Sequence, residues 1–305
     1  MGGGAKVGPK KGVLIILNCE LEGTAQLMSK LNDKTYYSHT CFGNVQAFFP
    51  EHLKNHINNE KEWINKSNVK NWNGKNMYVL QEGNMSNTHE GFIFLSVPTP
   101  ANKDGSINIK ILEGALDDIS EVHNGRNNAI LIRSTVIPGT TWTLQTKYPH
   151  LNILFNPEFL TERSANFDFI NQSRFVVGNS GKQISWAKSE EFVELIKDRF
   201  GDCVAVQETS YETAELIKYM SNCFFATKVS FMNEMYQIAE KIDANWDEAV
   251  SGFVADGRIG HSHMNVPGHD GKFGFGGSCF PKDTKGLVSA AEKYKTNLSL
   301  SLIHI

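Results

Sequence analysis

The run 273–283 (FGFGGSCFPKD) places one thiol, Cys279, on a glycine-rich turn with an amine and a carboxylate close behind it. Glycines let the backbone approach a ligand or adopt a positive φ, and the amine of Lys282 favours a nearby thiolate. Pro281 predicts a helix that begins here and places Cys279 near its positive end. The pattern indicates a nucleophilic cysteine. The alternative is a buried cysteine in a tight turn.

Short apolar runs alternate with amphipathic stretches along the first two thirds of the chain, which is the pattern of a parallel sheet covered by helices. Strands are predicted at 12–17, 91–97, 128–133, 151–155 and 174–178, and helices at 21–31, 109–122 and 185–200. We therefore predict an α/β fold with a Rossmann-like, doubly wound parallel sheet. Ligands of such sheets bind at the carboxyl ends of the strands.

A long helix is predicted at 208–244, because apolar residues recur at helical spacing and no Pro or Gly interrupts the segment. Lys218 and Asn222 are four residues apart, so they share one face of this helix. On spacing alone, a solvated lysine and an asparagine without a role are the alternative. The predicted domains are 1–207, with a divergent part at 1–90, and 208–305, a small α-helical domain that carries Cys279.

The run around Cys279 resembles the active-site motif of the UDP-glucose/GDP-mannose dehydrogenase family. Five further stretches occur in the family's order: SVPTP at 96–100, RSTVIPGT at 133–140, NPEFL at 156–160, ELIKY at 215–219 with Asn222, and RIG at 258–260. The resemblance covers roughly residues 91 to 290, whereas the first 90 residues match poorly. It implies an NAD-dependent enzyme that oxidises the C6 alcohol of a nucleotide sugar to a uronic acid in two steps, for surface polysaccharide synthesis.

The resemblance also implies roles for individual residues. The catalytic residues it implies are Cys279, Lys218, Asp283, Glu158, Asn222 and Thr135. The implied NAD-binding residues are Gly23, Val97, Pro98, Thr99, Ser134, Thr135, Glu162 and Lys282. The implied substrate-binding residues are Phe159, Leu160, Lys218, Asn222, Arg258, Phe273 and Gly276. Arg258 resembles an arginine that reaches the sugar or its phosphates from a neighbouring subunit, and the long helix resembles a dimer core, so we expect a homodimer.

The chemistry of alcohol oxidation fits these types of residue. Lys218 and Asn222 can hold a developing oxyanion, and Asp283 can order the water that takes the hydroxyl proton. Cys279 can add to the aldehyde and hold it as a thiohemiacetal and then a thioester. Glu158, supported by Thr135, is the candidate base for hydrolysis; the alternative is an acid in the first turn of a helix.

The expected cofactor turn departs from the family's pattern. The first strand leads into NCELEG at 18–23, which keeps Gly23 but has Asn18 and Glu20 in place of the first two glycines of Gly-x-Gly-x-x-Gly. A carboxylate here repels the pyrophosphate, so we expect weak NAD binding. An alternative function follows, in which a cofactor-deficient relative binds a sugar nucleotide or a partner without turnover.

Composition restricts the class of protein. Thirty basic and 33 acidic residues give a formal charge of −3, which does not indicate a nucleic-acid surface. Five irregularly spaced cysteines indicate a reducing compartment, and the sequence has neither an apolar run of about 18 residues nor a signal peptide, so we expect a cytoplasmic protein without a membrane span. His261, His263 and His269 lack a ligand set at metal spacing, and no metal site is predicted.

The resemblance implies a third region, a second small α/β domain that binds the nucleotide sugar. The sequence ends at Ile305, 22 residues after Asp283, and we expect that domain to be absent. A fragment and a compact relative with a differently held substrate are the two interpretations. The apolar ending LSLSLIHI at 298–305 favours truncation or burial in a partner.

Overall fold

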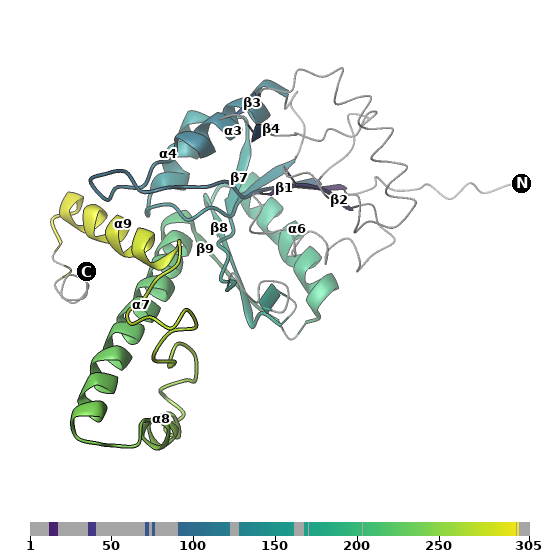
Figure 1. Ribbon diagram of the computed structural model, residues 1–305. Helices are drawn as coiled ribbons and strands as arrows, with labels where there is room; N and C mark the ends of the chain where they lie inside the picture. The colour runs from purple at the N-terminus through teal and green to yellow at the C-terminus, as the bar shows by residue number, and fades with distance from the viewer. Residues whose placement is uncertain are drawn as a thin grey trace, which may run out of the picture. The chain divides into compact units, whose positions relative to one another are not determined.

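A computed structural model describes residues 12–17, 36–40, 71–72, 75–76, 91–122, 128–161, 168–169, 171–202, 204–296 and 298 (Figure 1). The chain forms two compact units. The first contains Met1–Thr99 and Ile109–Glu215, and the second contains Pro100–Asn108 and Leu216–Ile305. The predicted division into domains 1–207 and 208–305 stays a prediction.

The first unit is built on a seven-stranded sheet. Its strands are β1 (Gly12–Leu17), β2 (Tyr36–Thr40), β5 (Gly91–Leu95), β6 (Ala129–Ile132), β7 (Asn152–Phe155), β8 (Arg174–Asn179) and β9 (Ala205–Ser210), in the spatial order β2-β1-β5-β6-β7-β8-β9. The chain places β2 on one side of β1 and β5 on the other, so the strand order reverses between β1 and β5. A crevice for a ligand is expected outside the carboxyl ends at such a reversal.

The sheet is mixed rather than wholly parallel. The strands from β2 to β7 pair in parallel, but β7 pairs antiparallel with β8 at Phe155 and Gly178. Strands β8 and β9 are parallel to each other. The prediction of an α/β, Rossmann-like sheet is therefore confirmed as a fold class, while the expectation of an all-parallel sheet is wrong for its last two strands. Short apolar runs predict strands but not their directions.

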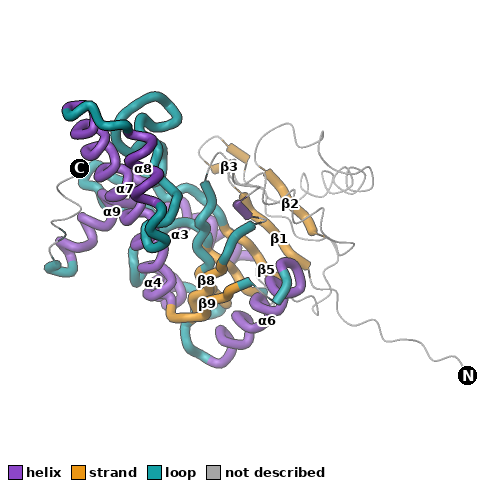
Figure 2. The backbone as a smooth tube through the Cα atoms, turned by 90° about the horizontal axis from the view of Figure 1, so that it is seen from below, coloured by secondary structure: helices purple, strands orange, loops and turns teal. Residues whose placement is uncertain are grey.

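Helices cover both faces of this sheet. Helix α6 (Gln183–Phe200) packs on β7 and β8, as Figures 1 and 2 show. Helices α3 (Lys110–Val122) and α4 (Thr140–Lys147) lie on the opposite face. Successive strand residues point to opposite faces, so apolar strands supply both cores. The core beneath α6 contains Phe92, Phe94, Ala129, Leu131, Leu154, Phe169, Phe175, Val177, Phe192 and Ile196.

Helix α4 is a short helix that its sequence does not predict. The segment TTWTLQTK is rich in β-branched residues, which have modest helix propensity. Its first turn is capped by Glu215, whose carboxylate accepts hydrogen bonds from the backbone N–H of Gly139 at 2.6 Å and of Thr141 at 2.7 Å. A carboxylate satisfies the unpaired donors of a helix N-terminus and interacts favourably with its dipole.

The long helix begins later than predicted. Residues 205–210 form β9 against β8, and α7 spans Tyr211–Lys241 rather than 208–244. The Ser210 hydroxyl accepts a hydrogen bond from the backbone N–H of Thr213 at 3.3 Å, as an N-cap residue does. Pairing with β8 therefore keeps residues 208–210 extended, although no helix breaker precedes them.

The second unit consists of most of α7 with two shorter helices, α8 (Trp246–Val254) and α9 (Phe280–Lys293). The loop between α8 and α9 folds against α7. Its Met264 and Val266 are buried with Met232 of α7, and Tyr236 and Trp246 pack against the same cluster. Helix α7 thus supplies the surface that holds the loop leading to Cys279.

Candidate active site

Cys279 immediately precedes α9 and is exposed. Its carbonyl accepts the hydrogen bond of the Asp283 N–H at 2.8 Å, and Pro281 lies in the first turn. The Sγ lies 3.8 Å from the hydroxyl of Ser278. The thiol therefore stands at the N-terminus of a 14-residue helix, where the dipole favours a thiolate.

The glycine run before Cys279 has the backbone geometry expected from the sequence. Gly274 and Gly277 have φ values of 83° and 79°, which non-glycine residues rarely adopt. The N–H of Gly274 donates to Oδ1 of Asn233 on α7 at 2.9 Å. Asn233 was not among the predicted site residues. Nothing in the sequence distinguishes an asparagine that makes this contact from any other asparagine within a helix.

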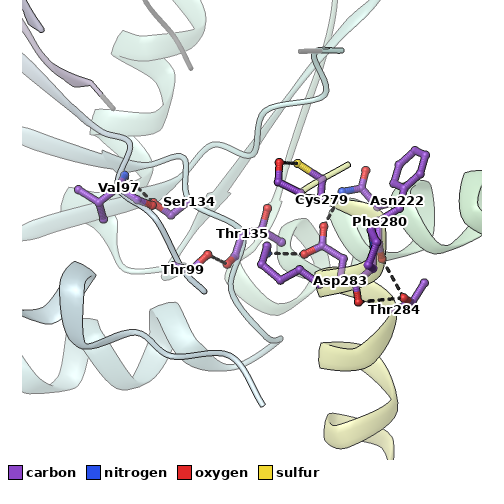
Figure 3. A network of polar contacts seen from close by, with 12 residues as sticks. Val97, Thr99, Ser134, Thr135, Asn222, Cys279, Phe280, Asp283 and Thr284 are labelled. Atoms are coloured by element: carbon purple, nitrogen blue, oxygen red, sulfur yellow. Dashed lines mark hydrogen bonds and ion pairs between the residues drawn. The ribbon is translucent and has the colours of Figure 1, made fainter. Parts of the chain in front are cut away.

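A buried carboxylate lies one turn after the thiol. Asp283 is 0% exposed, and its Oδ2 accepts a hydrogen bond from Asn222 Nδ2 at 2.6 Å (Figure 3). Its Oδ1 pairs with Lys282 Nζ at 2.5 Å. Lys218 precedes Asn222 by four residues on α7 and is only 6% exposed. The second unit therefore brings together Asn222, Lys282 and Asp283. The alternative interpretation of Lys218 as a solvated lysine is wrong.

The two described cysteines have opposite environments. Cys223, on α7, is buried, and burial together with the negative charge of Asp283 raises its thiol pKa to about 12. Cys279 is exposed at a helix N-terminus. Because the thiolate is the reactive species, Cys279 is the better nucleophile of the two.

Two of the predicted substrate residues of the second unit, Lys218 and Asn222, lie on α7, and the other three lie on the loop between α8 and α9. The side chain of Arg258 is 89% exposed and is held by Asp256, with Nε–Oδ1 and Nη2–Oδ2 distances of 2.9 and 2.5 Å. This partner raises the pKa of the Arg258 guanidinium. Phe273 and Gly276 are exposed on the same loop. Lys228 of α7, which was not predicted, donates to the carbonyl of Gly260 at 3.0 Å and so anchors this part of the loop.

The carboxyl ends of β5 and β6 in the first unit are joined by side-chain hydroxyls (Figure 3). Ser134 Oγ accepts from the Val97 N–H at 2.9 Å and donates to the Val97 carbonyl at 2.7 Å. Thr99 Oγ1 donates to the Thr135 carbonyl at 2.8 Å. Pro98 lies between the residues that make these hydrogen bonds and is exposed. The predicted cofactor residues of these two strands therefore lie together.

An apolar surface remains at this edge of the sheet. The hydroxyls of Ser134 and Thr99 are occupied in holding the loops, which leaves half-buried Val97 and exposed Pro98 as an apolar surface. Sites for small molecules and cofactors are lined mostly by apolar groups, with a few polar groups that fix the orientation of the ligand. The remaining predicted cofactor contacts in this unit, Gly23 and Glu162, and the departures at Asn18 and Glu20, lie outside the described residues.

The carboxyl end of β7 carries Glu158 on a half-buried loop. Its Oε1 accepts a hydrogen bond from the Leu160 N–H at 2.8 Å, and the ring of Phe159 lies 4.5 Å from the guanidinium of Arg174. Arg133, at the end of β6, donates from Nη1 to Asn156 Oδ1 at 2.5 Å. Arg133 and Asn156 were not predicted as site residues, although the sequence signal, a charged residue ending the apolar run AILIR, was present.

Two features are not found in the part of the chain that the structure describes. It contains no group of three or more His, Cys, Asp and Glu residues placed to hold a metal ion. None of the described helices is long and apolar enough to cross a membrane.

The chain matches models of two domains of one family. Residues 52–196 match the NAD binding domain of the UDP-glucose/GDP-mannose dehydrogenase family, and residues 212–304 match the central domain of that family. The chain is 38% identical over 212 residues to the UDP-glucose 6-dehydrogenase of Rickettsia prowazekii, covering 68% of this chain and 46% of the relative. It is 33% identical over 215 residues to UDP-glucose 6-dehydrogenase YwqF of Bacillus subtilis, with the same coverage of 68% and 46%.

Solved structures share the fold at low identity. A UDP-glucose dehydrogenase from Pyrobaculum islandicum superposes with a TM-score of 0.66 at 21% identity, covering 99% of this chain and 68% of the other. A 3-hydroxyisobutyrate dehydrogenase from Mycobacterium tuberculosis reaches a TM-score of 0.59 at 12% identity, covering 96% and 91%. These likenesses concern the fold alone.

The matches confirm the predicted family resemblance, and the NAD binding domain confirms NAD as the predicted cofactor. The match begins at residue 52, so the likeness extends into the segment before residue 91, which had been expected to match poorly. The chain spans about half the length of the curated relatives that it matches.

Proposed function

The chain belongs to the UDP-glucose/GDP-mannose dehydrogenase family, and we propose on this basis that it catalyses the NAD-dependent oxidation of a nucleotide sugar to its uronic acid. UDP-glucose is the leading substrate, and surface polysaccharide synthesis is the process that uses the product. The observation that carries the proposal is the exposed Cys279 at the start of α9, one turn before the buried Asp283 that Asn222 holds.

The first oxidation needs donors for the C6 oxygen and an acceptor for its proton. Asn222 and Lys218 occupy one buried face of α7 and act as the donors. The Asp283 carboxylate, already fixed by Asn222 and Lys282, orders the water that accepts the proton. Val97, Pro98, Thr99, Ser134 and Thr135 would hold NAD, which would supply the acceptor for the hydride.

Cys279 prevents the escape of the aldehyde. Its thiolate adds to C6, a C–S bond forms, and the carbonyl oxygen takes up a proton to give a thiohemiacetal. Loss of the C6 hydride, for which a second NAD would be the acceptor, and of the hydroxyl proton to water leaves a thioester on Cys279. The exposed position of the thiol supports this role, because the nucleophile must reach a carbon of a bound ligand.

Hydrolysis of the thioester releases the acid. Water adds to C6 with loss of a proton to Glu158, the C–S bond breaks, and the thiolate of Cys279 leaves. The Glu158 carboxylate is oriented by the N–H of Leu160, which supports its assignment as base. Thr135 and Glu162 assist it in this proposal, and Arg258, Phe159, Leu160, Phe273 and Gly276 bind the substrate.

Helix α7 supports the proposal of a homodimer. It carries a stripe of partly exposed apolar side chains at spacings of four and seven residues, which Ile242 continues just after the end of the helix: Leu216, Met220, Phe224, Phe231 and Ile238. Between 43% and 69% of each of these residues is exposed in the single chain. Such a stripe is typical of a helix that packs against a second helix. We further propose that the dimer acts in the cytoplasm.

Product formation tests the proposal. UDP-glucose, GDP-mannose and N-acetylated UDP-sugars are each incubated with NAD and the chain, and NADH is followed by its absorbance. The expected result is NADH formation with one of them, with UDP-glucose as the leading case. Binding of a sugar nucleotide in calorimetry without NADH would instead support the alternative of a binding protein without turnover.

A further inference from the structure

We propose that Arg133 is a positioning residue that acts through Asn156 to fix Glu158, the base assigned to thioester hydrolysis. The inference rests on the proposed function. It begins with the register of the sheet, in which Leu95 pairs with Ile132 and Ile132 with Phe155. The residues that directly follow the three strands are Ser96, Arg133 and Asn156. These three residues therefore lie in one row, just beyond the carboxyl ends, with their side chains on one face of the sheet.

Backbone hydrogen bonds extend the ladder into this row. The N–H of Arg133 donates to the Leu95 carbonyl at 2.9 Å, and the N–H of Asn156 donates to the Ile132 carbonyl at 2.8 Å. The row is therefore part of the rigid sheet rather than of the loops that follow it. Residues on rigid elements are suited to holding catalytic groups in place.

The side chains of the row are buried and connected. Arg133 and Asn156 are 7% and 1% exposed. Arg133 Nη1 donates to Asn156 Oδ1 at 2.5 Å, and Asn156 Nδ2 donates to the Val176 carbonyl of β8 at 2.7 Å. Both ends of the Asn156 amide are thus occupied, which fixes the side chain between β6 and β8.

Glu158 follows this fixed asparagine by two residues. Pro157, which is buried, lies between them and restricts the backbone through its ring. The positive charge of Arg133 and the carboxylate of Glu158 attract each other, while burial lowers the pKa of the guanidinium. Arg133 therefore acts on Glu158 in two ways, by the hydrogen bond to Asn156 and by charge.

A purely structural role accounts poorly for this arginine. Its Nε and the neighbouring Ser96 Oγ are buried without a hydrogen-bond partner among the described residues. Burying a cation with an unsatisfied donor costs stability, and an apolar side chain of similar volume is often equally stable or better. A guanidinium at this position is explained if its hydrogen bond to Asn156 and its charge hold the carboxylate of Glu158 in place.

The test isolates the hydrolysis step. The probe p-nitrophenyl acetate transfers its acetyl group to the Cys279 thiolate with release of p-nitrophenolate, and water then converts the thioester to acetate. Intact mass follows the acetyl adduct, and peptide mapping assigns it to Cys279. This step needs neither NAD nor a sugar nucleotide, so its outcome is independent of the substrate assigned above.

The variants are Glu158→Gln, Arg133→Met, Arg133→Lys and, as a matched control, Lys188→Met. Lys188 is a buried cation of the same unit, 2% exposed and paired with Glu191 on α6, and it has no proposed role in the site. General bases contribute at least about a hundredfold, so we expect Glu158→Gln to slow deacetylation by that factor. We expect a loss of about tenfold in Arg133→Met and substantial recovery in Arg133→Lys, which keeps the charge and a donor.

Thermal unfolding separates positioning from stability. Lys188→Met should lower the melting temperature without slowing deacetylation. The proposal is overturned if Arg133→Met deacetylates at the wild-type rate, if Lys188→Met slows the step equally, or if Glu158→Gln leaves it unchanged. Failure of the proposed function would appear differently, as wild-type deacetylation that depends on Glu158 and Arg133 without NADH formation from any nucleotide sugar.

Discussion

Asn222 Nδ2 donates a hydrogen bond to Asp283 Oδ2 over 2.6 Å and thereby joins α7 to the first turn of α9. Lys282 Nζ lies 2.5 Å from the other carboxylate oxygen. Because Asp283 is fully buried, these two partners replace the water that its carboxylate loses on folding. The contact connects the helix that carries the predicted oxyanion donors with the helix that begins at the thiol.

Asp283→Ala should destabilise the chain, because it leaves the buried amide of Asn222 and the amine of Lys282 without their carboxylate. We expect a loss of about 3 kcal/mol in the free energy of unfolding, measured by urea titration. Glu292→Ala, an exposed substitution on the same helix, is the control and should change that free energy by less than about 0.5 kcal/mol. Equal stability of the two variants would contradict the role of Asp283.

The two described cysteines should differ in reactivity. Iodoacetamide at pH 8 is expected to alkylate Cys279 and to leave Cys223 unmodified, because burial raises the pKa of Cys223 to about 12. Peptide mapping by mass spectrometry compares the two sites in the native chain. Denaturation in urea should make both react. Equal alkylation of both under native conditions would contradict the assignment of the nucleophile.

Glu215 predicts a dependence of stability on pH. Burial raises its pKa from 4.5 to about 7, although its carboxylate caps α4. The folded state therefore holds the proton more tightly than the unfolded state. This contribution is fully present below pH 4.5 and is lost as the pH rises through 7. Between these values the free energy of unfolding of the wild type should fall with pH more steeply than that of Glu215→Gln.

Denaturant titrations at pH 5, 6 and 7 measure this slope. Glu190→Gln, on the exposed side of α6, is the matched control and should keep the wild-type slope. If Glu215→Gln also keeps it, the buried carboxyl group does not titrate in this range.

Phe231→Asp should disrupt the proposed dimer, because it places a charge in the middle of the apolar stripe of α7. Sedimentation at micromolar concentration should give a dimer for the wild type and a monomer for the variant. The control is Ile184→Asp, which also places an aspartate at an exposed apolar residue, here a 55% exposed residue of α6. This variant should remain dimeric. A monomeric wild type would rule out this use of the stripe.

The sequence predicts best what local chemistry determines. The helix start at Pro281 and the positive φ of Gly274 follow from residue types at fixed spacing. The strands predicted at 91–97 and 128–133 are present, but they end two residues and one residue earlier than predicted, at Leu95 and Ile132. The burial of Lys218 was implied by the family resemblance but not by spacing, since a helix face does not reveal what covers it.

What the sequence does not predict depends on contacts between distant segments. Helix α4 is capped by Glu215, 74 to 76 residues away, and residues 208–210 stay extended because β8 pairs with them. The bond of Arg133 to Asn156 requires the register of β6 and β7. No spacing rule within a single segment contains this information.

The ratio of NADH to uronic acid tests the central claim most directly. Oxidation of an alcohol to an acid releases two hydrides, so the wild-type chain should form two NADH for each uronic acid with the nucleotide sugar that it accepts. Cys279→Ser should form no acid, because an alkoxide neither holds the aldehyde nor leaves as a thiolate does. Acid formation by Cys279→Ser at the wild-type rate, or a wild-type product that stops at the aldehyde with one NADH, would contradict the account.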